Sequence, residues 1–511
     1  MIKGARMDKH ATRFFLLMAM ALWTSPAWAA PRWGKTPVKV ATGLPVVKDS
    51  ERFSRAIADG HGGTFLAWVA VDPLEDTGMR LYGQHISAEG KKLWNGGESL
   101  RLAAAPKINY GNLGLASDGA GGIVVSYQEV GESAHTFGRL NLLRVDASGR
   151  SLWTTEVPKA FGAGKYFLVP GGDGGVIALA SNENSSKAGE TVFLFRADGK
   201  GKILYSRDVY ATPSATTLLF ANLGFAGEKP GEALFILADR HQGDSFQVFA
   251  LHVDADGKVE DRRLSEDEWA GLNPELPCGR LIGASADGQG GAYVSWVGRK
   301  EGAEVLRLLR VDSHGNAAAT WPKGGVVVDN DSKSFKFGLA ATTDEQGGVL
   351  LQYVSRPHGP FEQEGTAPKN SSGASCDETH RYVTGTTPAQ YTADLWLARF
   401  GPKNASPLFS ARVARHLGQE QHEVVRSGEY IYSSWVEEPT RNVVAQVSDL
   451  TGRTRFGEGL VVGSYKGTGS LGITVMRGAG DTMVVAWKQS QHLYAQSISA
   501  AMIPTAPSEK R

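Results

Sequence analysis

A short motif recurs along this chain and constrains its fold more than any other feature. The residues Asp-Gly-x-Gly-Gly begin at Asp59, Asp118 and Asp287, and each copy leads into an apolar run with the alternation of a β-strand. About 25 to 30 residues later comes a second turn, which in the copy at Asp146 reads Asp-Ala-Ser-Gly and is followed by Trp153. A repeat of this length, made of short strands, predicts a radial or stacked β-architecture.

Each copy of the repeat contains four short strands, which in the first copy we expect at 54–58, 64–69, 81–86 and 99–102. The glycines that close the first turns, or that stand in their place, mark eight copies: Gly63, Gly122, Gly175, Gly231, Gly291, Gly348, Gly428 and Gly480. Eight copies predict an all-β fold, a single β-propeller with eight four-stranded blades over residues 30–503. Seven blades remain the alternative, because the fourth copy has lost the motif at its first turn.

The last copy stops after its third strand, and the N-terminal region contains a spare one. Residues 38–47 read Val-Lys-Val-Ala-Thr-Gly-Leu-Pro-Val-Val. We expect this segment to pair with the last blade, which would close the ring and remove a free sheet edge. Residues 504–511 are expected to be a disordered tail.

The first 29 residues have the pattern of a secretory signal peptide. Basic residues precede a short apolar segment at 14–23, and Ala27-Trp28-Ala29 offers small residues at the two cleavage positions. A buried N-terminal helix is the alternative. The apolar segment is too short to span a bilayer, and no second long one follows, so we expect an exported protein, periplasmic or secreted, with no transmembrane segment. A formal net charge of +1 predicts no nucleic-acid partner, and a monomer is expected.

The lengths of the connections distinguish the two faces of the predicted ring. In a four-stranded blade, the turns between the first and second strands and between the third and fourth strands lie on one face. Here these turns are short and rich in glycine, whereas the connections on the other face are long and irregular. The longest is an insertion at 355–393 in the sixth copy. Because function tends to lie on loops held by a rigid scaffold, the face with the long connections is the functional candidate.

The segment with Asp146, Gly149 and Trp153 resembles two propeller families. It is similar to the tryptophan-docking repeat of quinoprotein-like eight-bladed propellers, which has one more residue between Asp and Gly. It is also similar to the Asp-box of sialidase-type propellers, in which Trp lies closer to Gly. The Asp-Gly-x-Gly-Gly repeats resemble those of exported bacterial β-propeller proteins more closely, over nearly the whole mature chain. That resemblance implies the fold, with structural roles for the Asp and Trp, and leaves the chemistry open.

The chain has two cysteines, Cys278 and Cys376. In an oxidising compartment their simplest use is one disulfide, which would attach the insertion to the connection that enters blade five. Cys376 and His380 have a spacing that could serve a metal, but a zinc site needs two more ligands. The segment from Asp254 to Gly257 lacks the further oxygen ligands of a calcium loop. We therefore expect no metal, and the absence of adjacent cysteines argues against a quinone; no cofactor is expected.

Two functions remain open. The first is a non-catalytic propeller that binds a protein, glycan or envelope component, and its candidate binding residues are Trp269, Asp377, His380, Arg381 and Tyr382. The alternative is a glycoside hydrolase or lyase that acts on polysaccharide with carboxylates at the channel mouth. No Gly-x-Ser-x-Gly elbow occurs, and a polar insertion of this length contains acidic residues by chance. We therefore expect binding rather than catalysis and assign no catalytic residue.

Overall fold

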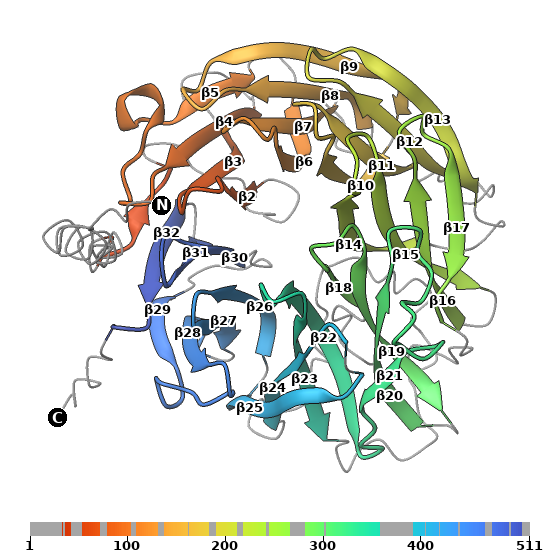
Figure 1. Cartoon of the computed structure of the whole chain (residues 1–511). Coiled ribbons are helices and arrows are strands. Elements are labelled where there is room, and N and C mark those ends of the chain that lie inside the picture. The colour runs from red at the N-terminus through yellow and green to blue at the C-terminus, as the bar shows by residue number, and fades with distance from the viewer. Residues whose placement is uncertain are drawn as a thin grey trace, which may run out of the picture.

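The protein is a ring of eight four-stranded antiparallel sheets (Figure 1). The computed structural model describes residues 33, 36–41, 54–71, 79–103, 109–130, 137–161, 163–182, 191–211, 218–241, 245–265, 282–300, 303–357, 392–403, 405–417, 419–437, 440–464, 473–489 and 492–502. The prediction of an all-β propeller with eight blades is confirmed, and the alternative of seven blades is wrong.

The blades follow one another along the chain, and the first strand of each lies closest to the ring centre in Figure 1. The first four blades contain β2 (Ser54–Ala58), β3 (Thr64–Val71), β4 (Met79–Ile86) and β5 (Leu100–Ala103); β6 (Asn109–Ser117), β7 (Ile123–Val130), β8 (Phe137–Val145) and β9 (Ser151–Phe161); β10 (Ala163–Pro170), β11 (Val176–Asn182), β12 (Thr191–Ala197) and β13 (Ile203–Ala211); and β14 (Leu218–Ala226), β15 (Ala233–His241), β16 (Ser245–Val253) and β17 (Val259–Arg263).

The second half of the ring repeats this order. Its blades contain β18 (Ile282–Ala286), β19 (Ala292–Lys300), β20 (Ala303–Val311) and β21 (Val326–Asp329); β22 (Ser334–Thr343), β23 (Val349–Pro357), β24 (Thr392–Phe400) and β25 (Pro407–Leu417); β26 (Gln419–Ser427), β27 (Tyr430–Glu437), β28 (Asn442–Asp449) and β29 (Leu460–Ser464); and β30 (Ile473–Arg477), β31 (Thr482–Gln489), β32 (His492–Ser499) and β1 (Val38–Lys39). A short 3₁₀ helix, η1 (Trp94–Gly97), lies between β4 and β5.

The N-terminal strand closes the ring as predicted. In β1, Val38 pairs with Ala495 and Lys39 with Tyr494 of β32, and the Val40 N–H donates to the carbonyl oxygen of Leu493 at 2.8 Å. The strand is the outermost of blade eight, so it covers an edge that would otherwise be unpaired. The predicted strand continued to residue 47; residues 42–47 lie outside the described residues, as do the predicted signal peptide and C-terminal tail.

Local hydrogen bonds explain why the Asp-Gly-x-Gly-Gly segments form turns. One carboxylate oxygen of Asp118 accepts hydrogen bonds from the backbone N–H groups of Ala120 and Gly122, at 2.8 and 2.7 Å. Gly119 and Gly121 both have positive φ, a conformation that glycine adopts without steric cost. Because every partner lies within five residues, the turn forms from the sequence alone.

The hydrophobic core lies mainly between neighbouring blades. One cluster joins Phe65 and Trp94 of blade one to Tyr110 and Val125 of blade two. The Trp94 indole Nε1 also donates to the carbonyl oxygen of Ala147 at 2.9 Å, in the turn between the third and fourth strands of the next blade. The expected structural role of these tryptophans, as links between blades, is confirmed for Trp94.

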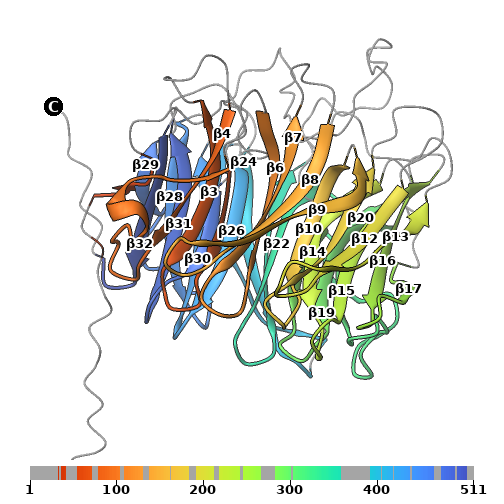
Figure 2. The ribbon, with the colours of Figure 1, turned by 90° about the horizontal axis from the view of Figure 1, so that it is seen from above.

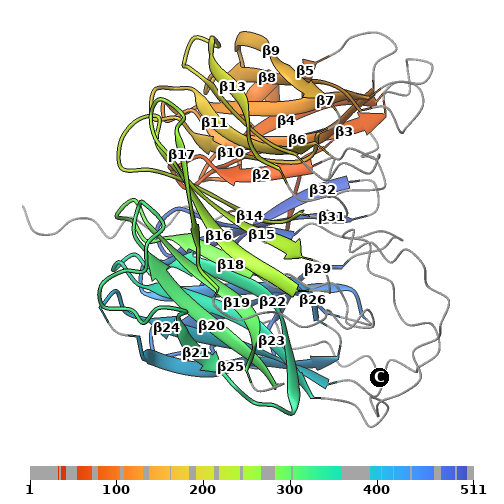
Figure 3. The same ribbon diagram turned by 90° about the vertical axis from the view of Figure 1, so that its right-hand side faces the viewer.

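The strand order places the short glycine turns on one face of the ring, here called the turn face. The connections between second and third strands and between blades lie on the other, the connection face. Figures 2 and 3 show the strands running between these two faces. The bounds of the insertion differ from the predicted 355–393. β23 ends at Pro357 and β24 begins at Thr392, and the two strands pair as far as Ser355 and Asp394, so both strands extend further than expected.

Candidate functional site

The residues predicted to bind a ligand lie outside the described residues. This holds for Trp269, Asp377, His380, Arg381 and Tyr382 and for both cysteines, Cys278 and Cys376. The strands from which their segments depart are described: β17 and β18 flank residues 264–281, and β23 and β24 flank residues 358–391. Both segments leave the scaffold on the connection face, from blades four to six.

A polar cluster lies where the insertion leaves blade six, and we call it the insertion root: Asp329, Ser334, Lys336, Tyr353 and Ser355. The Lys336 ammonium is fully buried and lies 3.7 Å from a carboxylate oxygen of Asp329. It also donates to the backbone carbonyl oxygens of Asp331 and Ser334. These contacts tie the connection between blades five and six to the first strand of blade six.

Two further members of the insertion root come from β23, the strand that leads into the insertion. The Ser355 hydroxyl donates to the Ser334 hydroxyl at 3.0 Å. Burial, followed by the Asp329 carboxylate, raises the pKa of Tyr353 well above its ordinary value, so the phenol stays protonated at every physiological pH. The buried lysine and the buried tyrosine therefore hold two connections in place.

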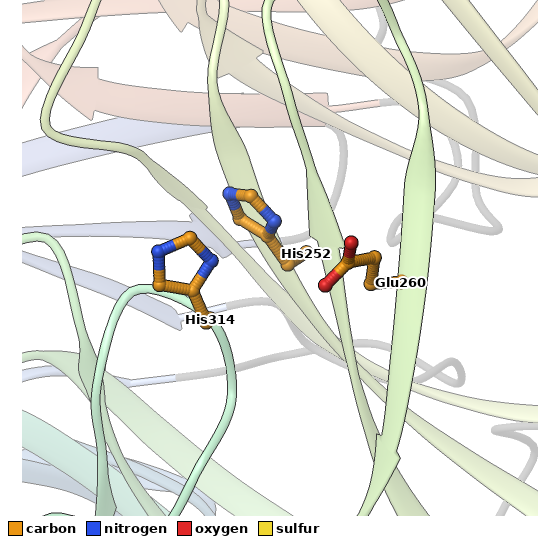
Figure 4. Close-up of side chains that lie close together, drawn as sticks. All are labelled: His252, Glu260 and His314. Atoms are coloured by element: carbon orange, nitrogen blue, oxygen red, sulfur yellow. The ribbon is translucent and has the colours of Figure 1, made fainter.

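A second cluster, which the sequence analysis did not single out, lies on the turn face between blades four and five. It consists of His252 on β16, Glu260 on β17 and His314 in the turn that follows β20 (Figure 4). The potential ligand atoms of these three side chains all lie within 4.8 Å of one another. Within the described part of the chain, this is the one group of three or more His, Cys, Asp or Glu side chains close enough to share a metal ion.

The two histidines contact each other edge to face, with ring centroids 4.5 Å apart. Burial, followed by the neighbouring His314 ring, lowers the pKa of His252, so its imidazole is neutral near pH 7 and carries one unprotonated nitrogen. The Glu260 carboxylate accepts hydrogen bonds from Lys258 at 3.0 Å and Arg262 at 3.3 Å. The hydrogen bond and charge of Lys258 lower the pKa of Glu260, which is therefore ionised.

This cluster arises where blade four departs from the repeat. In blades two, three, five and six, a turn aspartate faces an arginine near the end of the third strand, and in blade one a histidine takes that place: Asp118–Arg144, Asp173–Arg196, Asp287–Arg310, Asp344–Arg399 and Asp59–His85. Each arginine also donates to a carbonyl oxygen in the next blade: Gly199, Ala255, Pro402 and Leu450, in that order.

Blade four has no such pair. Its first turn begins at Gly227, whose N–H donates to the carbonyl oxygen of Glu232, and it contains no aspartate. A Cβ at Gly227 would clash with the Glu232 side chain, so the repeat's aspartate does not fit there. His252 stands at the arginine position, in Leu-His-Val-Asp where blade two has Leu-Arg-Val-Asp. Alignment of the copies would have shown this substitution, whereas the approach of His314 depends on how the blades pack.

The nearby segment at Asp254 is a plain turn, as the sequence analysis expected. One Asp254 carboxylate oxygen accepts hydrogen bonds from the backbone N–H groups of Asp256 and Lys258, at 3.0 and 2.7 Å.

Among the described residues, no helix has the length and apolar character needed to cross a membrane.

The comparisons with known proteins assign no family to this chain. No protein-family model and no curated protein matches the chain. A europium-containing methanol dehydrogenase is 9% identical over 88% of this chain and 83% of that chain, with a TM-score of 0.41. The β-propeller domain of the trilobed protease from Pyrococcus furiosus is 10% identical over 79% and 97%, with a TM-score of 0.37. Oligogalacturonate lyase in complex with manganese is 8% identical over 91% and 99%, with a TM-score of 0.40. At TM-scores of this size, the likeness carries no argument about this chain.

Proposed function

We propose that this protein is an exported β-propeller that binds a protein, glycan or envelope component through its connection face and does not transform it. The observation that carries the proposal is the asymmetry of the two faces. The turn face consists largely of short turns closed by their own Asp and Gly residues, as at Asp118. The connection face carries the 34 residues from 358 to 391 between two paired strands. Binding loops on rigid scaffolds have this arrangement.

The insertion root supports the same face. Lys336 pairs in register with Ser355 of β23, and its fully buried side chain contacts Asp329, so the strand that leads into the insertion is tied to the connection between blades five and six. The candidate binding residues are those of the sequence analysis: Trp269 as an aromatic platform, with Asp377, His380, Arg381 and Tyr382 from the insertion.

We also propose that Cys278 and Cys376 form a disulfide that attaches the insertion to the connection entering blade five. Closing a loop of about 100 residues nominally contributes about 4–5 kcal/mol to stability, although measured values often fall short. Peptide mass mapping without reduction should recover the two cysteines in one linked peptide. Free thiols at both positions in the exported protein would contradict this pairing.

The test of the binding function is a glycan array and a panel of envelope polysaccharides, followed by calorimetric titration of any hit with the full chain. Trp269→Ala and Arg381→Ala should abolish binding and leave the Tm nearly unchanged. Arg150→Ala is the matched control, because Arg150 is exposed on the turn face. Unchanged binding after removal of residues 358–391 would exclude this face as the site.

Catalysis remains the alternative, as a hydrolase or lyase that acts on polysaccharide. Prolonged incubation of the protein with each bound polysaccharide, followed by chromatography of the products, distinguishes the two functions. We expect no cleavage. Shortened products that disappear in Asp377→Asn would overturn the non-catalytic assignment. Export is tested separately by fractionation of cells that make the chain with and without residues 1–29.

A further inference from the structure

We propose that His252, Glu260 and His314 form a site for a divalent late transition-metal ion such as Zn²⁺, which links blade four to blade five. The site lies on the turn face, away from the proposed ligand surface. It is therefore independent of the proposed function, and either can fail without the other.

The first argument is the state of His252. The residue is 7% exposed, and its ring meets the His314 ring edge to face with centroids 4.5 Å apart. A side chain whose rotamer is held by packing needs little reorganisation to bind an ion. The side chains of His314 and Glu260 lie close to His252 (Figure 4), and the potential ligand atoms of all three lie within 4.8 Å of one another, so one ion would be within reach of each.

The donor set determines which ions fit. Two imidazole nitrogens and one carboxylate oxygen suit Zn²⁺ and its neighbours Ni²⁺ and Cu²⁺, whereas Ca²⁺ and Mg²⁺ prefer all-oxygen sites. A zinc ion lies about 2.0–2.2 Å from each such ligand, so the three donor atoms must approach somewhat from their present spread of 4.8 Å. His314 is exposed and Glu260 is half-buried, so both can rotate toward the fixed ring of His252. Three protein ligands would leave one position for water.

The charges around the cluster allow a cation but make Glu260 the weakest of the three ligands. Lys258 and Arg262 hold its carboxylate, which orients it and partly neutralises it. We therefore expect the two histidines to supply most of the affinity.

The position of the site gives it a structural purpose. In neighbouring blades, an arginine at the position of His252 reaches a carbonyl oxygen of the next blade, as Arg310 reaches Pro402 at 3.1 Å. The imidazole is too short and carries too few donors to make the same link. A metal ion shared by His252 of blade four and His314 of blade five would take the place of this link and connect blade four to the next blade.

The experiment is calorimetric titration of the full-length protein with Zn²⁺, after chelation and without a polyhistidine tag. We expect one strong equivalent, and at least about a tenfold loss of affinity in His314→Gln, since even an indirect partner of a metal ligand contributes this much. His252→Gln should lose as much, but the test depends on His314→Gln because His314 is exposed and its replacement leaves the core intact. His61→Gln is the matched control, because His61 is exposed in a turn of blade one, and it should bind as tightly as the wild type.

The chain has 12 histidines. A second measurement excludes binding by those other than His252 and His314. Zn²⁺ that binds the folded state should raise the Tm by mass action, by at least about 1 °C, in the wild type and not in His314→Gln. The metal-free Tm of the two proteins should agree. The absence of a strong equivalent, or an equal affinity and Tm increase in His314→Gln, would overturn the proposal.

Discussion

The indole Nε1 of Trp33 donates a hydrogen bond to the carbonyl oxygen of Ala88 at 2.9 Å. This is the contact that Trp94 makes with Ala147 one blade further on. The N-terminal segment therefore joins the two ends of the repeat through two contacts. The strand β1 pairs with the last strand of blade eight, and the Trp33 indole binds blade one. Because blades one and eight are the two ends of the repeat, these contacts hold the ring closed.

Trp33→Ala should destabilise the protein by about 3 kcal/mol, because the ring is 6% exposed and packs with Val40 and Leu66 in the cluster between blades eight and one. Trp33→Phe should lose less, since it keeps most of the apolar contact. Denaturant unfolding measures both. Equal stability of the wild type and Trp33→Ala would show that the strand alone closes the ring.

Two glycines of the first turn provide a matched test of the same junction. Gly60 and Gly62 both have positive φ, so alanine is strained at either position by about 1 kcal/mol. A Cβ at Gly60 meets nothing within 4 Å, whereas one at Gly62 would lie 2.6 Å from the Cα of Ala479 in blade eight. Gly62→Ala should therefore lower the Tm clearly more than Gly60→Ala. Equal effects would mean that blade eight can move away from blade one without cost.

The buried Asp–Arg pairs should contribute far more than the exposed ones. Arg310 donates to an Asp287 carboxylate oxygen at 2.7 and 3.0 Å and to Pro402 of the next blade, and Asp287 is buried. Arg310→Met leaves this carboxylate unpaired and should cost about 3–5 kcal/mol in unfolding free energy. Arg139→Ala, which removes an exposed pair with Glu156, should cost less than about 1 kcal/mol.

The pH dependence of stability should include a contribution from Asp59. Burial would raise the pKa of Asp59, but hydrogen bonds from the His85 ring and from the backbone of His61 and Gly63 outweigh burial and lower it. The contribution is therefore present above the ordinary pKa of about 3.9 and is lost as the pH falls through the lower folded-state value. In Tm measurements from pH 6 to pH 2, Asp59→Asn should show a smaller loss than the wild type.

The exposed Asp208 is the control for that measurement, and Asp208→Asn should follow the wild-type curve. If Asp59→Asn and the wild type lost the same Tm over the whole pH range, other carboxylates would account for the acid sensitivity.

The sequence by itself determined the parts of this protein that depend on short-range interactions. The turn at Asp118 uses hydrogen bonds within five residues, so its residue types specify it wherever they occur. Strand alternation and the count of copies then led to eight blades. Even the distant pairing of the N-terminal strand with the last blade could be predicted, because the last copy lacked a strand and the chain held one that no other copy used.

Only the tertiary structure decided which side chains from different blades meet. Four strands, β17 to β20, separate His252 from His314 along the chain, and the contact of the two rings depends on how blades four and five pack. The burial of Lys336 beside Asp329 follows from the packing of β22 and its neighbours. No local pattern encodes such contacts, because they form between different copies of the repeat. Closure of the ring brings these copies together, and the residue order within one copy does not.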